Sequence, residues 1–212
     1  GGTSLRLLRN IDRFSEDLDF DNLGLTLTQI DNLINTIRTR FTQENITVEL
    51  VTTHRGDKNY YELRFPNLLY DLKLSTNQRE KLIIKIDYTS FWQGHKPEVI
   101  LFSKYGFLER VITNPLNHLL IQKLSAYVNR SQTQPRDIYD IIWLYSQGAR
   151  FDSSFAKENS LTDIIDKAQN KLIKEGMSQT LYSRLKPLLF TENNIEKLTL
   201  FPDVIKALKS TI

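Results

Sequence analysis

The sequence predicts an α+β protein, with a mixed sheet and flanking helices in residues 1–112 followed by a helical half in residues 113–212. In the first part, runs of alternating or continuous apolar residues predominate, which is typical of β-strands. In the second part, apolar residues recur at the spacing of a helix face, and proline and glycine stand where helices begin and end. With 212 residues, 40% of them hydrophobic, the chain is large enough to bury a sizeable core.

Helices and strands are both predicted before residue 113. Thr3 or Ser4 is expected to cap a short leucine-containing helix. Residues 14–21, FSEDLDFD, alternate strictly and predict a strand with aspartates on one face and apolar side chains on the other. Residues 26–44 have apolar residues at helical spacing and predict a helix. Further strands are predicted at residues 46–53, 59–65, 69–75, 81–89 and 97–102. Gly56 is expected to supply the positive φ of a hairpin turn between the first two of these.

Two helices are predicted with clear boundaries after residue 113. The first spans residues 113–130, with Asn114 as its cap and Pro115 in the first helical position. The second begins at Pro135 and ends at Gly148. The remainder of the chain is also helical in pattern, and it contains no internal repeat or low-complexity segment.

Composition excludes several classes of protein. The chain has no cysteine, which excludes disulfides and thiolate metal sites and favours a cytoplasmic location. No stretch approaches the roughly 20 apolar residues that a membrane-spanning helix needs, so no membrane partner is expected. The formal net charge of +3 permits nucleic-acid binding without indicating it.

Two aspartates stand two positions apart in the strand predicted at residues 14–21. Side chains at positions i and i+2 of a strand point to the same face, so Asp17 and Asp19 are expected side by side. Carboxylates that close repel each other, and Mg²⁺ relieves the repulsion because it prefers hard oxygen ligands. Asp87 on a later strand, which shares its face with Lys85, is the candidate third ligand. The alternative is a solvated edge strand whose outer face is acidic.

A glycine pair precedes the first predicted helix. Gly1 and Gly2 would leave backbone N–H groups open to a phosphate, which the helix dipole also favours. A tight turn is the alternative explanation for two consecutive glycines. The presence of a possible phosphate-binding turn and an acidic strand within one short stretch favours a functional interpretation of both.

This first stretch, GGTSLRLLRNIDRFSEDLDF, resembles the first motif of the AbiEii/AbiGii toxin family, within the polymerase-beta-type nucleotidyltransferase superfamily. The motif is a Gly-Gly or Gly-Ser turn, a short helix, and a strand with two aspartates separated by an apolar residue. Gly1, Gly2, Asp17 and Asp19 occupy these positions, and Asp87 in KIDYT matches the third aspartate of the superfamily. The family normally has a segment before the glycines, and because this chain does not begin with Met we expect residues upstream.

A second block, LIQKLSAYVNRSQTQPRDIYD, matches a lysine, an arginine and a DxxD motif of the same family. Lys123 falls on the apolar stripe of its predicted helix, so its ammonium must either reach the helix margin or meet an anion. Asp137 and Asp140 lie one turn apart on one face, although a helix dipole also favours acids in the first turn. The resemblance places all of these residues in the site, and Arg136 could equally pair with one of the site carboxylates.

The resemblance implies a nucleotidyltransferase core in residues 1–112 and a helical region in residues 113–212 that contributes Lys123 and the RDxxD helix. It implies a metal-dependent nucleotidyltransferase toxin that transfers NMP from a nucleoside triphosphate to RNA, the 3′ end of tRNA being the expected acceptor, and releases pyrophosphate. A cognate antitoxin encoded beside the toxin is the expected protein partner.

The resemblance also implies a role for each matched residue. Asp17, Asp19 and Asp87 would hold two Mg²⁺ ions, for which Mn²⁺ could substitute, and Asp87 would help to deprotonate the acceptor hydroxyl. The implied catalytic residues are Asp17, Asp19, Asp87, Lys123 and Asp137. The implied nucleotide-binding residues are Gly1, Gly2, Thr3, Ser4, Lys123, Arg136 and Asp140.

Two other functions are compatible with the same residues. The chain could be a catalytically inactive module that binds a nucleotide or RNA, or it could transfer NMP to a protein or small-molecule hydroxyl. The presence of every motif position argues against the inactive module.

Overall fold

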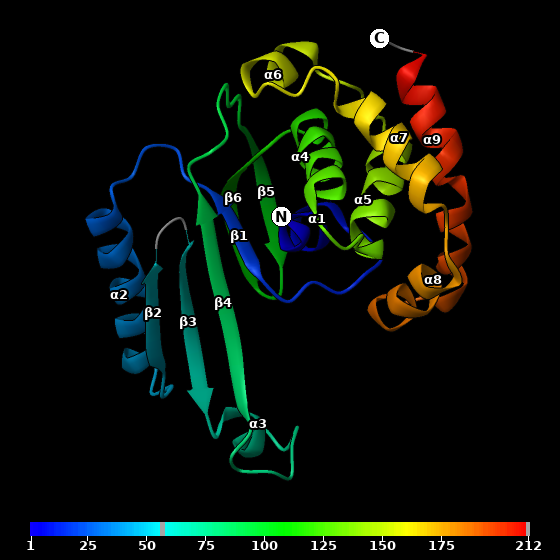
Figure 1. Ribbon diagram of the computed structural model, residues 1–212. Helices are drawn as coiled ribbons and strands as arrows, with labels where there is room; N and C mark the ends of the chain where they lie inside the picture. The colour runs from blue at the N-terminus through cyan, green and yellow to red at the C-terminus, as the bar shows by residue number, and fades with distance from the viewer. Residues whose placement is uncertain (56–57, 211–212) are drawn as a thin grey trace. The chain divides into compact units, whose positions relative to one another are not determined.

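The computed structural model describes residues 1–55 and 58–210, which form two compact units (Figure 1). The first unit consists of Gly1 and Glu16–Phe91, and the second of Gly2–Ser15 together with the chain from Trp92 onward. The predicted α+β class is confirmed. A functional division at residue 112 stays a prediction, because the compact units group residues by contact and not by activity.

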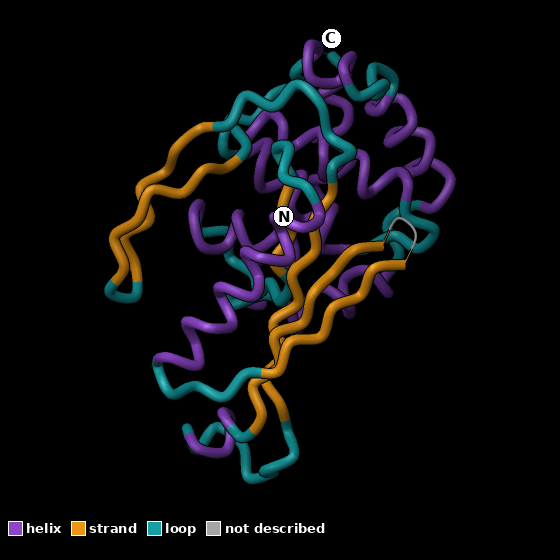
Figure 2. Tube along the Cα trace, turned by 90° about the vertical axis from the view of Figure 1, so that its left-hand side faces the viewer, coloured by secondary structure: helices purple, strands orange, loops and turns teal. Residues whose placement is uncertain are grey.

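A four-stranded mixed sheet forms the body of the first unit. Its strands are β1 (Leu18–Asp21), β2 (Glu49–Arg55), β3 (Lys58–Pro66) and β4 (Lys81–Thr89). They lie in the order β1-β4-β3-β2, with β1 parallel to β4 and the other pairs antiparallel. Figure 2 shows the strands in orange. The parallel pairing matters for the site, because it brings the acidic segment beside the strand that carries Asp87.

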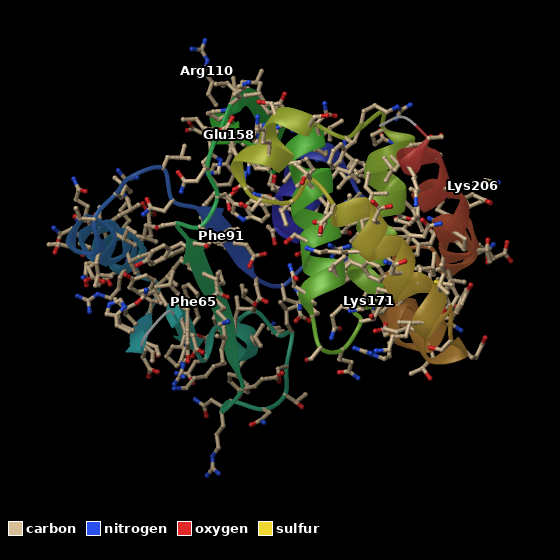
Figure 3. The ribbon with its side chains drawn as sticks, turned by 45° about the horizontal axis from the view of Figure 1, so that its top comes forward. Phe65, Phe91, Arg110, Glu158, Lys171 and Lys206 are labelled. Atoms are coloured by element: carbon tan, nitrogen blue, oxygen red, sulfur yellow. The ribbon has the colours of Figure 1, made fainter. Side chains whose placement is uncertain are left out.

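Helix α2 (Leu27–Gln43) covers one face of this sheet. A capping box formed by Thr26 and Gln29 fixes its first turn. Its buried side chains pack on alternate residues of β3 and β4, which leaves the opposite face of those strands for charged residues. The core, which includes the Phe65 labelled in Figure 3, consists of Ile30, Ile34, Tyr61, Leu63, Phe65 and Ile86.

Three sequence predictions for the first ninety residues need correction. The strand predicted at residues 69–75 is wrong: Asn67 turns the chain at a φ of 62°, and the next residues close the single-turn helix α3 (Leu68–Asp71). The strand predicted at residues 14–21 is shorter, since β1 begins only at Leu18. The caps predicted for the first helix are also wrong, because α1 (Gly2–Arg9) already begins at Gly2. The hairpin turn predicted around Gly56 lies outside the described residues.

The second unit combines α1 with a two-stranded hairpin and a bundle of helices. The hairpin pairs β5 (Glu98–Lys104) with β6 (Phe107–Thr113), and β6 was not predicted because its polar residues Glu109 and Arg110 are adjacent. The helices are α4 (Leu116–Asn129), α5 (Pro135–Ser146), α6 (Ser153–Glu158), α7 (Ile164–Glu175), α8 (Gln179–Leu185) and α9 (Phe201–Lys209), with 3₁₀ segments at Lys186–Leu188 and Glu192–Leu200.

Helices α4 and α5 are the centre of this bundle. They pack on each other, α4 also contacts α7, and α5 contacts α9 (Figure 1). The predicted start of α5 at Pro135 is confirmed, whereas α4 begins one residue later than predicted, at Leu116. No helix in residues 1–55 and 58–210 is long and apolar enough to cross a membrane.

Candidate active site

Three of the predicted site carboxylates gather on one face of the first unit's sheet. Asp19 on β1 lies directly opposite Asp87 on the parallel strand β4. Asp17 immediately precedes β1, and its negative charge acts on Lys85, two residues before Asp87. This face is the one that α2 does not cover, because the residues that alternate with these charges belong to the core.

Lys85 is the cation next to the carboxylates of this face. Its Nζ donates a hydrogen bond to Asp87 Oδ2 at 2.8 Å and lies 4.7 Å from the ring centroid of Tyr60. The hydrogen bond to Asp87 raises the pKa of Lys85, and the charges of Asp87 and Asp17 add to this effect against the opposing effect of burial. Both members of the pair are about one-third exposed, at 37% and 34%, so water and ions can reach them.

The three carboxylates suit a divalent cation as a set of donors but are not arranged around one. Among the described residues, no group of three Asp, Glu, His or Cys side chains is positioned to hold a metal ion. Asp87 is engaged by Lys85 instead. Carboxylate oxygens on one face of two neighbouring strands are nevertheless the ligands that Mg²⁺ prefers. The donor chemistry therefore fits a divalent metal ion, provided that Asp87 releases Lys85 and binds the metal instead.

The glycine pair is required by close packing. A Cβ atom on Gly1 would lie 2.2 Å from Asp19 Oδ2, and one on Gly2 would lie 2.7 Å from both Arg13 Nη2 and Ser15 Oγ. Any side chain at either position would collide with these groups. The glycines thus let the backbone approach both the acidic strand and the segment that leads into it.

Helix α1 begins at Gly2, and the N-terminal turn of a helix is where backbone N–H groups can bind an anion. Thr3 Oγ1 donates to Ser15 Oγ at 3.0 Å, and Ser4 Oγ shares a hydrogen bond of 3.0 Å with Thr113 Oγ1. The two side chains predicted to cap the helix therefore tie α1 to neighbouring segments of the second unit.

Lys123 and the DxxD motif form a buried ion network in the second unit. Lys123 Nζ lies 2.9 Å from Asp140 Oδ2 and 3.6 Å from Asp137 Oδ1. Of the two alternatives expected for this lysine, the helix margin or an anion, the structure shows the anion, and its nearest carboxylate is that of Asp140. Asp137 and Asp140 share one helix face, as predicted, and both are fully buried.

Arg130 completes the network on the other side of Asp137. Its Nε lies 2.9 Å from Asp137 Oδ2. Lys171 on α7, labelled in Figure 3, donates to the carbonyl oxygens of Tyr127 at 2.8 Å and Arg130 at 2.7 Å, which fixes the chain at the end of α4. Arg130 is in this way held where it can reach α5.

Arg13 is the most buried cation of the network, with 2% of its side chain exposed. Its Nε and Nη2 donate to the two carboxylate oxygens of Asp140, each at 2.6 Å, and its Nη1 donates to the Phe14 carbonyl at 2.7 Å. Burial alone would raise the pKa of Asp140, but Lys123 and Arg13 outweigh burial and lower it. Asp140 therefore remains ionised between two cations.

Arg136 differs from its neighbours in this block. Its side chain is partly exposed and forms no ion pair with any residue of the described chain. The proposal that it pairs with a site carboxylate receives no support from these contacts.

The family described as "Nucleotidyl transferase AbiEii toxin, Type IV TA system" matches residues 1–201. The chain belongs to this family. The match spans both compact units and confirms the resemblance seen in the first motif. The comparison with curated proteins gave no match.

Membership of the AbiEii family gives the chain a general activity. The family consists of nucleotidyltransferase toxins of toxin–antitoxin systems, which implies a nucleotide substrate and an antitoxin partner. The α+β fold with a mixed sheet and a helical C-terminal part is consistent with a nucleotidyltransferase.

Sequence reasoning missed three charged residues of these clusters. Lys85 was noted as a neighbour of Asp87 but not as its ion-pair partner, and Arg130 and Arg13 were not considered. The position of Lys85 two residues before Asp87 was a usable signal. Arg13 gave none, because its partner Asp140 lies 127 residues away along the chain.

Proposed function

We propose that this AbiEii-family chain is a metal-dependent nucleotidyltransferase that transfers NMP from a nucleoside triphosphate to an RNA hydroxyl and releases pyrophosphate. The observation that carries the proposal is the alignment of Asp19 with Asp87 on neighbouring parallel strands, with Asp17 next to them. The proposed acceptor, suggested by the family resemblance, is the 3′ end of tRNA, and the proposed location of the reaction is the cytoplasm. The proposed division of labour is a nucleotidyltransferase core in residues 1–112 and a helical region in residues 113–212.

The three aspartates supply the chemistry at the reacting phosphate. Asp17, Asp19 and Asp87 would hold two Mg²⁺ ions, which when bound neutralise charge on the attacking and leaving oxygens. Asp87 accepts the proton of the acceptor hydroxyl as that oxygen bonds to the α-phosphorus. The bond between the α-phosphorus and the bridging oxygen breaks, and pyrophosphate carries that oxygen away.

The N-terminus of α1 holds the phosphates that leave. The N–H groups of Gly2, Thr3 and Ser4 point along the helix axis at its positive end, which favours anions. The side chains of Thr3 and Ser4 support this role indirectly. Their hydrogen bonds to Ser15 and Thr113 orient the helix.

Lys123 neutralises the charge that develops on pyrophosphate. Asp140 holds its ammonium and is itself held by Arg13, so we assign Asp140 to the positioning of Lys123. Asp137, engaged by Arg130, supports the same lysine from the other side. Arg136 has no ion pair among the described residues, and we assign it to binding of the nucleotide or the RNA.

A double-label assay tests the transfer. The purified chain is incubated with Mg²⁺, total tRNA and each nucleoside triphosphate in turn, labelled at the α-phosphate or at the γ-phosphate. We expect the α-label to enter RNA and the γ-label to stay out, since pyrophosphate leaves. Asp17→Ala should reduce labelling to background, whereas Glu16→Ala, a change at the exposed neighbouring acid, should not.

Other outcomes of this assay favour the alternative functions. Labelled protein in place of labelled RNA, when cell extract is added, would indicate a protein acceptor. Nucleotide binding without transfer to any acceptor would indicate an inactive binding module.

A growth assay tests the toxin role. Expression of the wild-type chain should arrest growth, and co-expression of the protein encoded beside it should restore growth. Asp17→Ala should be harmless when expressed alone at the same level.

A further inference from the structure

The acidic face of the first unit carries its own cation. The register of β1 and β4 sets Asp19 opposite Asp87, and the negative charge of Asp17, which precedes β1, acts on Lys85. Lys85 is the ion-pair partner of Asp87, with its Nζ 2.8 Å from Asp87 Oδ2. Asp19, Asp87 and Lys85 thus lie close together on two paired strands, and Asp17 lies at the start of one of them.

An ammonium group and a divalent metal ion compete for the same oxygens. The three neighbouring carboxylates repel one another, and the positive charge of Lys85 offsets part of this repulsion. When a divalent cation binds, it supplies that charge itself and requires the lone pairs of Asp87 that Lys85 occupies. The two cations also repel each other if both remain in place.

We propose that Lys85 is a built-in counter-cation that competes with the divalent metal for Asp87, so that metal loading displaces its ammonium from Asp87 Oδ2. This inference rests on the proposed metal site, and it adds a positioning residue that controls how tightly the site binds metal. The displaced ammonium has a place close by: it already lies 4.7 Å from the ring centroid of Tyr60, within the range of a cation–π contact.

The same strand offers a matched control residue. Lys81 also lies on β4 and forms an ion pair, with Glu49 at 2.7 Å, and its side chain is 38% exposed against 37% for Lys85. Replacing either lysine by glutamine removes one positive charge and one exposed ion pair from β4. Only the change at Lys85 removes the competitor of the metal.

The test measures metal binding without nucleotide or turnover. The purified chain is titrated with Mn²⁺, and the free ion is followed by its electron paramagnetic resonance signal. Lys85→Gln should bind Mn²⁺ about three- to tenfold more tightly than the wild type, the range expected for removing a partly exposed like charge. Lys81→Gln should match the wild type. Lys85→Arg, which keeps the charge, should also remain close to the wild type.

A double-mutant cycle identifies Asp87 as the point of competition. In an Asp87→Asn background Lys85 has lost this partner, so Lys85→Gln should no longer tighten Mn²⁺ binding to the same extent. Circular dichroism of each variant confirms that the fold is retained.

The outcomes separate this inference from the proposed function. Equal or weaker Mn²⁺ binding by Lys85→Gln, with clear binding by the wild type, overturns the inference and leaves the metal site standing. Absence of Mn²⁺ binding in the wild type and in every variant overturns the metal site and the inference together. Binding by Lys85→Gln with little binding by the wild type supports the inference strongly.

Discussion

At the scale of single residues, the stability of the second unit depends on keeping the buried carboxylate of Asp140 ionised and paired. Its carboxylate has no exposed surface and receives two hydrogen bonds from Arg13 and one ion pair from Lys123. Moving these charges out of water is costly, and the cost is offset only while every partner is present. The network is therefore a sensitive point of the fold as well as the support of Lys123.

Removing the charge of Asp140 should be strongly destabilising. Asp140→Asn leaves Arg13 buried without its anion and Lys123 with only its longer contact to Asp137, and we expect a loss of about 3–5 kcal/mol in the free energy of unfolding, measured by urea titration. The exposed pair of Lys167 and Asp163 is the control, because its two side chains are 52% and 55% exposed. Lys167→Ala should cost less than about 1 kcal/mol. Similar losses for the two variants would contradict the role of burial.

The contribution of Asp140 should also depend on pH in one direction. Its pKa in the folded chain is lowered from the ordinary value of 3.8 because Lys123 and Arg13 outweigh burial. A carboxylate whose pKa falls on folding contributes stability above its unfolded pKa and loses it as the pH falls through its folded pKa. The stability difference between wild type and Asp140→Asn should be constant near neutral pH and shrink below about pH 4. A difference that grows on acidification would contradict this assignment.

Individual residues also show how far the sequence alone could predict the site. Asp17, Asp19 and Asp87 could be grouped in advance, because strand alternation and the family motif both place them on one face. The cost of burying an unpaired ammonium predicted that Lys123 either reaches the helix margin or meets an anion, but it did not predict that Asp140 of the DxxD motif is that anion. The partner of Arg13 could not be predicted, since no local pattern connects two residues separated by 127 positions.

At the scale of structural elements, close packing at the start of α1 accounts for the glycine pair more fully than phosphate binding alone. The turn that begins α1 packs against Arg13 and Ser15, and Gly1 packs against Asp19. Each glycine removes a Cβ atom that would occupy the space of a polar group. The pair is thus needed for packing whether or not a nucleotide is bound.

Gly2→Ala should be destabilising although alanine favours helices by about 1 kcal/mol over glycine. The new Cβ would lie 2.7 Å from Arg13 Nη2, which cannot move without disturbing Asp140. We expect a net loss of about 1–3 kcal/mol in unfolding free energy. Ser15→Gly removes the second colliding atom and should restore part of the loss in the double variant. Purely additive effects of the two changes would contradict the steric explanation.

Elements with a local signal were predicted well, and those that depend on long-range contacts were not. The capping residues of α2 and the proline of α5 mark their starts in the sequence itself. The run at residues 69–75 alternates like a strand, but no strand in the described part of the chain pairs with it, and its first residues form α3 instead. Strand β6 is a different case: it pairs with β5 across the two-residue turn of Tyr105 and Gly106, and its adjacent polar residues Glu109 and Arg110 obscure the alternation of a strand.

At the scale of the whole molecule, the predicted site residues are divided between two units with separate cores. Asp17, Asp19 and Asp87 belong to the first unit, whose core lies between α2 and the sheet. Lys123 and the DxxD motif belong to the second, whose core surrounds α4 and α5. Because all three proposed metal ligands lie in the first unit, the response to metal alone should be confined to that unit.

Hydrogen exchange measured by mass spectrometry tests this confinement. Mn²⁺ added without nucleotide should slow exchange in peptides that cover β1 and β4, because bridging carboxylates on two strands stabilises their pairing. Peptides from α4 and α5 should exchange at unchanged rates. In Asp19→Asn, which removes a proposed ligand on β1, the metal should protect neither strand. Metal-dependent protection of α4 or α5 would contradict a metal site built from the first unit's aspartates alone.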